Sequence, residues 1–115
     1  MDLKEQTNKL AQHLVYLKEI YETYEPPKNK RDSQFFSNVK KQTEPVFHLL
    51  VEWEAKALQT IQTNEVHVHP QQIVSTKENM ELILMHSFYK DVKRKRYMEL
   101  IQSVQFILDQ LRRSL

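Results

Sequence analysis

Residues 97–115 read YMELIQSVQFILDQLRRSL, and this C-terminal stretch decides the fold class. Its apolar side chains recur at steps of four, three, four, three and four residues. They are Tyr97, Ile101, Val104, Leu108, Leu111 and Leu115. This spacing places them on one face of an α-helix, because a helix has 3.6 residues per turn. The pattern predicts an amphipathic helix whose apolar face packs against other helices.

The N-terminal half of the chain repeats the same pattern in two stripes. The stripe expected on a helix over residues 3–24 comprises Leu3, Thr7, Leu10, Leu14, Leu17, Tyr21 and Tyr24. Pro26 and Pro27 end this helix, because proline has no N–H and restricts the residue before it. The next stripe comprises Phe36, Val39, Thr43, Val46, Leu50, Trp53, Ala57, Thr60 and Asn64, with Asp32 or Ser33 as the expected N-cap.

Pro45 lies inside the second stripe. A proline in a helix interior costs about 3 kcal/mol or more and usually kinks the helix. The stripe nevertheless keeps its phase across Pro45, and two separate helices would have no reason to share one register. We therefore predict one long helix from Ser33 to Gln62 that is kinked near Pro45.

The remaining elements complete the predicted fold. We interpret residues 64–74 as a connection, since they show no sustained period. Ser75 to Glu78 matches a capping box, so we expect a third helix to begin there. It carries Leu82, Ile83, Met85 and Phe88, and a break over residues 89–92 separates it from the last helix. The sequence thus predicts one all-α domain over residues 1–115, an antiparallel up-down-up-down four-helix bundle.

Composition excludes several classes of protein. The 115 residues include no cysteine, so disulfides, thiolate metal sites and cysteine nucleophiles are absent. They include no glycine, so phosphate-binding P-loops and dinucleotide-binding fingerprints are absent too. The N-terminus begins with acidic residues and lacks the apolar segment of a secretion signal, and no apolar run reaches the roughly 18 residues of a membrane span. We expect a cytoplasmic protein.

Several short motifs stand out beside the helix pattern. They are Phe35-Phe36-Ser37-Asn38-Val39-Lys40, Glu52-Trp53, Ala57-Leu58, His69-Pro70-Gln71-Gln72-Ile73, Glu78-Asn79, Lys95-Arg96-Tyr97 and Ser103-Val104. Together they resemble the YppE-like family of small uncharacterised bacterial proteins, over nearly the whole chain. The resemblance implies a four-helix bundle in the cytoplasm of Gram-positive bacteria. It brings no assigned activity, cofactor or catalytic residue.

Patterns typical of enzymes are missing or incomplete. The five histidines are His13, His48, His67, His69 and His86, and none lies three residues after a glutamate, as a carboxylate-bridged di-iron bundle requires. Glu-x-x-Glu pairs occur, but without the second acidic pair, ending in aspartate, that helical pyrophosphatases use for magnesium. We therefore predict no catalytic, metal-binding or cofactor-binding residue. A metal-dependent enzyme, with histidines from different helices, is the less favoured interpretation.

Charge is distributed unevenly along the chain. Lysine and arginine total 17 against 15 acidic residues, a formal net charge of +2. Eight cations lie in or beside the first and third connections: Lys28, Lys30, Arg31, Lys90, Lys93, Arg94, Lys95 and Arg96. In the predicted bundle both connections lie at one end, which we call the basic pole. Four acids lie there too (Glu22, Glu25, Asp32 and Asp91), so the basic pole has a formal charge of +4.

The basic pole gives the leading functional interpretation. We expect a non-enzymatic protein–protein interaction module that binds an acidic partner, as a monomer or a homodimer. The alternative is binding of a nucleic acid or a phosphate ligand at the same pole, with an affinity that falls steeply with salt. The small net charge and the lack of a recognised binding motif argue against this alternative.

Trp53 lies on the apolar stripe of the long helix and has two interpretations. In the first, it is a buried anchor whose indole N–H finds a hydrogen-bond partner. In the second, it forms the wall of a pocket opened by the kink at Pro45, with Thr43 and Thr60 as polar groups in the same seam.

Overall fold

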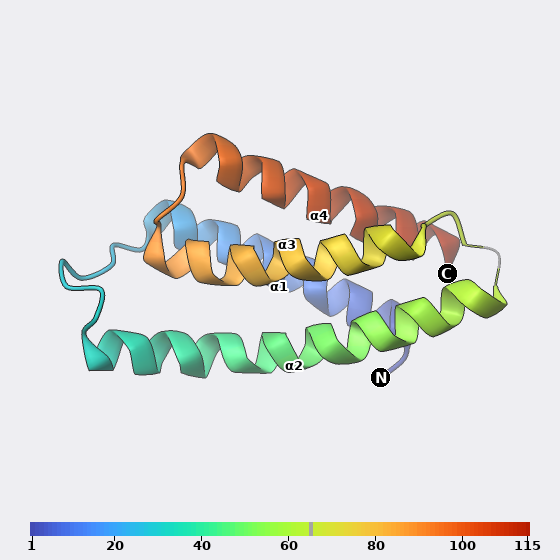
Figure 1. Cartoon of the computed structure of the whole chain (residues 1–115), viewed down its shortest axis with the longest axis horizontal. Coiled ribbons are helices and arrows are strands. Elements are labelled where there is room, and N and C mark those ends of the chain that lie inside the picture. Colours follow the sequence, from blue (N-terminus) through green and yellow to red (C-terminus); the bar gives the residue numbers. More distant parts are fainter. Residues whose placement is uncertain (65) are drawn as a thin grey trace.

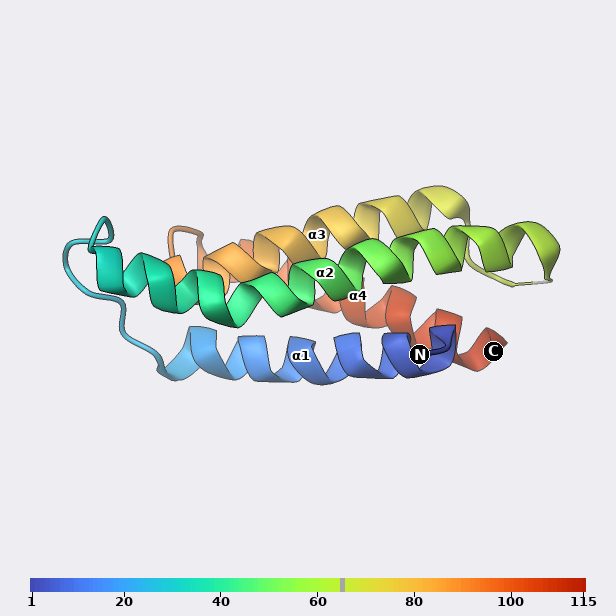
Figure 2. The ribbon, with the colours of Figure 1, turned by 90° about the horizontal axis from the view of Figure 1, so that it is seen from below.

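The computed structural model describes residues 1–64 and 66–115 and, within them, contains four α-helices (Figure 1). They are α1 (Leu3–Thr23), α2 (Ser33–Thr63), α3 (Pro70–Tyr89) and α4 (Arg94–Ser114). Figures 1 and 2 show that each helix runs in the opposite direction to the one before it. The predicted all-α, up-down-up-down bundle is confirmed.

The four helices form a bundle in which only one of the two diagonal pairs, α1 and α3, is in contact within the described residues. α1 packs against α2, α3 and α4, and α3 likewise packs against all three of its neighbours. Within the described part of the chain, α2 and α4 do not contact each other. They therefore occupy opposite edges of the bundle, and each has one side that no other helix covers.

The apolar stripes form most of the core, although Phe36, Leu82 and Leu115, all expected on buried faces, are exposed. Tyr97 and the other α4 stripe residues up to Leu111 are buried, as predicted. Phe36, expected in the core, is 57% exposed, whereas its neighbour Phe35 is only 5% exposed. The ring of Phe35 packs against Tyr24 and Tyr89, with ring centroids 6.2 and 5.0 Å away. These aromatic contacts at the end of the bundle determine which phenylalanine is buried.

α2 is continuous through Pro45, as predicted. Its 31 residues correspond to about 46 Å, close to the 49 Å length of the whole molecule. Pro45 and Lys41 are both exposed, so the carbonyl of Lys41, which cannot receive a hydrogen bond from Pro45, lies on the solvent side. Figure 2 shows that α2 is bent in its N-terminal half, as expected for a proline on the outer face.

α3 begins at Pro70, five residues before the predicted start at Ser75. His69 is the N-cap: its Nδ1 accepts a hydrogen bond from the amide of Gln71 at 3.0 Å. The side chain of Gln72 accepts from the amide of His69 at 2.8 Å, which completes a capping box. Proline at the first helical position is pre-organised for a helix, so this earlier signal prevails over the Ser75 box. The predicted connection over residues 64–74 is thus too long, and Glu65 within it lies outside the described residues.

None of the helices in the described ranges is both long and apolar enough to cross a membrane.

Candidate functional site

The two loops that form the basic pole lie at the same end of the bundle, as predicted (Figure 1). The first joins α1 to α2 over residues 24–32, and the second joins α3 to α4 over residues 90–93. The pKa of Asp91 in the second loop is lowered, mainly by a hydrogen bond from His86 and further by the charge of Lys30 in the first loop. Asp91 is thus held mainly by His86, at the end of α3.

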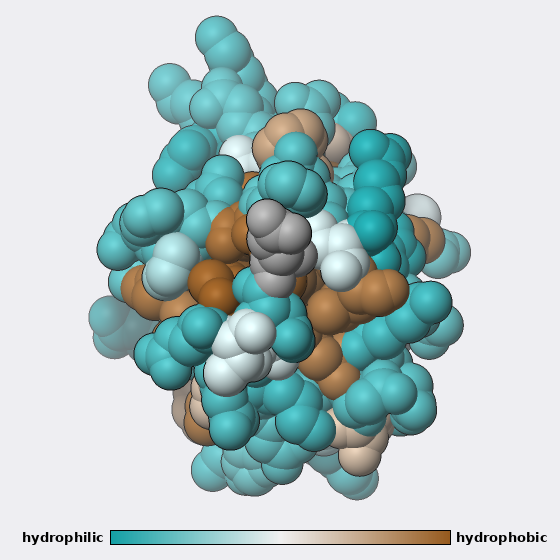
Figure 3. All heavy atoms as spheres, turned by 90° about the vertical axis from the view of Figure 1, so that its right-hand side faces the viewer, coloured by the Kyte–Doolittle hydropathy of each residue, from teal (hydrophilic) through white to brown (hydrophobic). Residues whose placement is uncertain are grey.

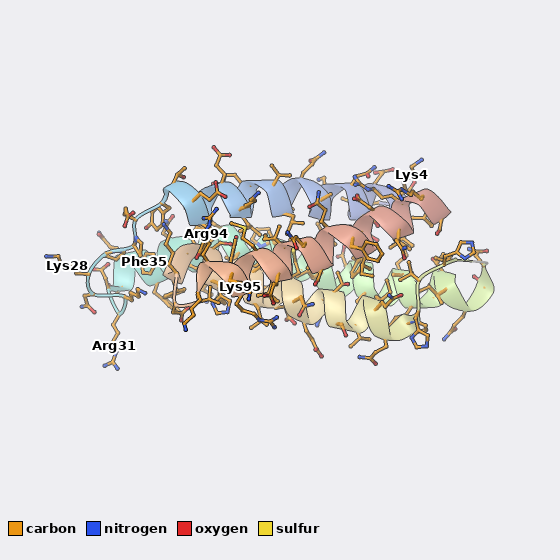
Figure 4. The ribbon with its side chains drawn as sticks, turned by 90° about the horizontal axis from the view of Figure 1, so that it is seen from above. Lys4, Lys28, Arg31, Phe35, Arg94 and Lys95 are labelled. Atoms are coloured by element: carbon orange, nitrogen blue, oxygen red, sulfur yellow. The ribbon has the colours of Figure 1, made fainter. Side chains whose placement is uncertain are left out.

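The eight cations of the basic pole do not share one face. All are exposed except Lys90, which is half-buried. Figure 4 shows Lys28 and Arg31 projecting from the tip of the first loop, whereas Arg94 and Lys95 lie farther back, on α4. The structure thus divides the basic pole into a loop group and a group at the start of α4.

The group at the start of α4 lacks a helix cap. Lys93 is the N-cap residue, and its side chain makes no capping hydrogen bond, because an ammonium group has no acceptor. Arg94 lies 3.5 Å from Glu22 of α1, and Arg96 lies 3.9 Å from Glu99 one turn along α4. The first turn of α4 contains no acidic residue. This turn therefore presents cations where the positive end of the helix dipole favours anions.

Lys90 ends α3 in an unusual conformation. Its φ angle is 54°, in the left-handed region that favours glycine, and the chain contains no glycine. Its amide donates to the carbonyl of His86 at 2.9 Å. Its Nζ lies 5.8 Å from the ring centre of Tyr21, which in turn stacks on Tyr97 at 3.8 Å. Lys90 is therefore tied to α1 as well as to α3.

Tyr97 is part of the core and does not form a surface for stacking bases. It is fully buried, and its hydroxyl donates to the carbonyl of Leu17 at 3.1 Å. The hydroxyl of Ser87 lies 2.6 Å from the hydroxyl oxygen of Tyr97, and it donates to the carbonyl of Ile83 at 2.6 Å. Burial raises the pKa of Tyr97 to about 12. This polar cluster joins α1, α3 and α4 just inside the basic pole.

The structure does not bring the three residues of the suggested pocket together. Trp53 is fully buried, and its indole N–H donates to the hydroxyl of Thr7 at 3.0 Å, in agreement with the first interpretation. Thr43 and Thr60 each donate to a carbonyl one turn back in α2. Of the three, Thr43 alone lines a described groove, the one between α2 and α3. Apart from its position on the α1 stripe, no sequence signal identified Thr7 as the partner of Trp53.

The histidines are spread over the molecule. His69 caps α3, and Nδ1 of His86 lies 2.9 Å from a carboxylate oxygen of Asp91. His13 lies between α1 and α2, where burial and the nearby charge of Lys9 lower its pKa. Among the described residues, no three histidine or acidic side chains lie close enough together to hold a metal ion.

The opposite end of the bundle has a different surface. Figure 3 shows apolar residues gathered at the centre of that end and hydrophilic residues around them. Both termini lie there (Figure 1), and Met1 and Leu115 are 56% and 39% exposed. The end opposite the basic pole thus combines an apolar centre with a hydrophilic rim.

Two grooves between helices were not predicted from the sequence. One lies between α1 and α4, with a volume of about 530 Å³, and includes Val15, Lys18 and Arg112. The other lies between α2 and α3, with a volume of about 350 Å³, and is lined mainly by apolar residues. Each lies between side chains of two different helices, whose juxtaposition a stripe pattern does not reveal.

Comparison with known proteins identifies the family. Residues 7–115 match the model of a bacterial domain of unknown function, DUF1798. The uncharacterised protein YppE of Bacillus subtilis strain 168 is 29% identical over 87 residues, which cover 74% of this chain and 71% of YppE.

The crystal structure of YppE from Bacillus subtilis has the same fold. It superposes with a TM-score of 0.85 at 22% sequence identity, covering 97% of this chain and 90% of that chain. The predicted resemblance to the YppE-like family is confirmed. This chain belongs to the bacterial family of unknown function DUF1798.

Proposed function

We propose that this protein is a non-enzymatic, cytoplasmic interaction module whose basic pole binds an acidic surface of a partner protein. The observation that supports this proposal is the composition of the first turn of α4. Arg94, Lys95 and Arg96 lie there, and the N-cap residue Lys93 makes no side-chain capping hydrogen bond. The remaining cations of the basic pole enlarge the charged surface at the same end.

The start of α4 is unfavourable for the isolated chain. A cation near a helix N-terminus opposes the helix dipole by about 0.3–1 kcal/mol. α1, α2 and α3 each begin with a side chain that accepts a hydrogen bond from the helix. Glu22 and Glu99 partly compensate Arg94 and Arg96, whereas Lys95 has no ion-pair partner within the described ranges. Carboxylates of a bound partner would remove the conflict.

The aromatic residues beside the basic pole favour a protein partner over a nucleic acid. Proteins that bind single strands stack bases on exposed aromatic rings. Tyr97 is fully buried, and Tyr89 is half-buried, with its ring against that of Phe35. Neither presents the open face that such stacking requires.

A comparison of two triple variants tests the proposal. The protein and the variant Arg94→Glu, Lys95→Glu, Arg96→Glu are used to capture partners from a native lysate, with and without nuclease. We expect the unmodified protein to retain a partner with an acidic surface that resists nuclease, and the variant to lose it. The purified pair should then bind with an affinity that falls as salt rises.

The matched control is the variant Lys4→Glu, Lys9→Glu, Arg113→Glu. It reverses the same number of exposed charges at the other end of the bundle, where Figure 4 shows Lys4. It should retain the partner, and circular dichroism should show that both variants fold. Equal retention by the two variants would contradict a contact at the basic pole. Loss of all retained material with nuclease would support nucleic-acid binding instead.

A further inference from the structure

The connection between α3 and α4 turns through a residue that is poorly suited to the turn. Lys90 has a φ angle of 54°, in the left-handed region where a Cβ atom is crowded by the following carbonyl oxygen. Glycine is the common residue at such a place, just past the end of a helix. Among the described residues, only Lys90 has a positive φ angle. Backbone strain of this kind persists where the surrounding structure enforces it, and it is concentrated at functional sites.

Two cations, one at each end of the connection, contact consecutive residues in the last turn of α1. Nζ of Lys90 lies 5.8 Å from the ring centre of Tyr21, within the range of a cation–π interaction. The guanidinium of Arg94 lies 3.5 Å from the carboxylate of Glu22. Tyr21 also stacks on Tyr97 of α4, with ring centroids 3.8 Å apart. The start of α4 is thus joined to the end of α1 by residues at both ends of the connection.

The connection is also held to α3 and to the core. The amide of Lys90 donates to the carbonyl of His86 at 2.9 Å, and Nδ1 of His86 lies 2.9 Å from a carboxylate oxygen of Asp91. Val92 is half-buried and packs against the hydrophobic core. Each residue from 90 to 92 therefore has a contact of its own, and together these contacts maintain the left-handed turn.

The first loop does not hold its cations in this way. Within the described ranges, the side chains of Lys28 and Arg31 form no ion pair, and Figure 4 shows both of them projecting from the tip of the loop. A surface that is fixed before binding loses less conformational entropy when a partner binds. The start of α4 is therefore the preorganised part of the basic pole.

We infer that Lys90 is a positioning residue for the contact with the partner. Its left-handed turn and its contact with Tyr21 fix the first turn of α4 against α1, in the orientation that the partner binds. The inference rests on the proposed function, because it concerns the same cations. A residue better suited to the left-handed region would relieve the strain at position 90 but would lose the contact with Tyr21. Lysine at this position thus serves the contact with the partner at the expense of a relaxed backbone.

Three substitutions separate the contact with Tyr21 from charge and strain. Lys90→Asn removes the ammonium and places at position 90 a residue that tolerates the left-handed region. Lys93→Gln is the matched control, because it removes one charge from the same connection, and Lys93 makes no side-chain capping hydrogen bond. Lys90→Arg keeps a cation at position 90 and should behave like the unmodified protein.

Hydrogen exchange of the Tyr97 amide measures how firmly the start of α4 is held. This amide donates to the carbonyl of Lys93, the N-cap residue, at 3.0 Å. We expect its exchange to be about fivefold faster in Lys90→Asn than in Lys93→Gln. The urea midpoint of Lys90→Asn should not fall, because the relieved strain offsets the lost contact. A lower urea midpoint with faster exchange throughout the chain would indicate an ordinary stabilising role and would overturn the inference.

Partner capture from a native lysate, as in the test of the proposed function, gives the second measurement. Lys90→Asn should retain about threefold less of the partner than Lys93→Gln, whereas Lys90→Arg should retain as much as the unmodified protein. Equal exchange in Lys90→Asn and Lys93→Gln would overturn the inference alone, and so would faster exchange with equal capture. If the unmodified protein captured no partner, the proposed function would fail, and the positioning role of Lys90 with it.

Discussion

The first turns of α2 and α4 lie at the same end of the bundle but are built differently. α2 begins with Asp32, whose carboxylate accepts a hydrogen bond from the amide of Phe35 at 3.0 Å. α4 begins with Lys93, which makes no such bond, and continues with Arg94, Lys95 and Arg96. The first arrangement stabilises a helix, and the second opposes its dipole. The start of α4 thus carries charges that oppose its own helix dipole, which is why we assign the proposed contact to it.

Removing the cap of α2 should have the largest effect on stability. Asp32→Ala deletes the acceptor for the Phe35 amide, and we expect the free energy of unfolding to fall by about 1 kcal/mol. Urea unfolding measures this change. Asp32→Asn keeps a side-chain acceptor and should retain most of the stability. If Asp32→Ala left the free energy of unfolding unchanged, the starts of α2 and α4 would not differ energetically.

Reversing one charge at the start of α4 should have a smaller effect of the opposite sign. Lys95→Glu places an acid in the first turn, and we expect the free energy of unfolding to rise by about 0.5 kcal/mol. Thermal unfolding at low salt measures the gain, which should shrink as salt is added. Arg113→Glu in the last turn is the control and should lower stability. A loss of stability in Lys95→Glu would mean that this lysine supports the fold, which would weaken our proposal.

A substitution in the loop that leads into α4 should have the smallest effect on stability, and this effect should depend on pH. The hydrogen bond from His86 lowers the pKa of Asp91 below its ordinary 3.8. A carboxyl group whose pKa is lower in the folded state stabilises the protein above that ordinary value, and this stabilisation is lost as the pH falls through the lowered value. Asp91→Asn should therefore be less stable than the unmodified protein at pH 7, and the difference should shrink below pH 3.8.

Urea unfolding of both proteins from pH 7 to about pH 2.5 measures this difference. The effect should be small, since the side chain of Asp91 is 62% exposed. His86→Ala should abolish the difference between aspartate and asparagine at position 91. A difference that stays constant with pH would show that the His86–Asp91 bond does not stabilise the loop.

Periodicity predicted most of the fold because the apolar stripes largely determine which helix faces are buried. The predicted helix from Ser33 to Gln62 differs from α2 by one residue, and the continuity across Pro45 is confirmed. The start of α3 was wrong because two local capping signals competed, and proline at position 70 favoured the earlier one. Phe35 and Phe36 were exchanged because both fit the stripe within one helical step, and aromatic contacts between helices decided between them.

Among the candidate sites too, one feature was predicted from the sequence and others were missed. The meeting of the two basic loops follows from topology, so the sequence predicted it. The exposure of Phe36, Val51 and Leu82 was missed because it depends on which sides of α2 and α3 other helices cover. The pairing of Trp53 with Thr7 was missed for a related reason, since it depends on the registry of α1 against α2.

The separation of α2 from α4 gives this small protein two outer edges on opposite sides of the bundle. The two helices touch α1 and α3 but, within the described chain, not each other. Substitutions at distant sites without shared contacts have additive effects on free energy. Changes on the outer sides of α2 and of α4 should therefore combine without interference. A family built on this bundle can alter the surface at one edge while the other edge keeps its own.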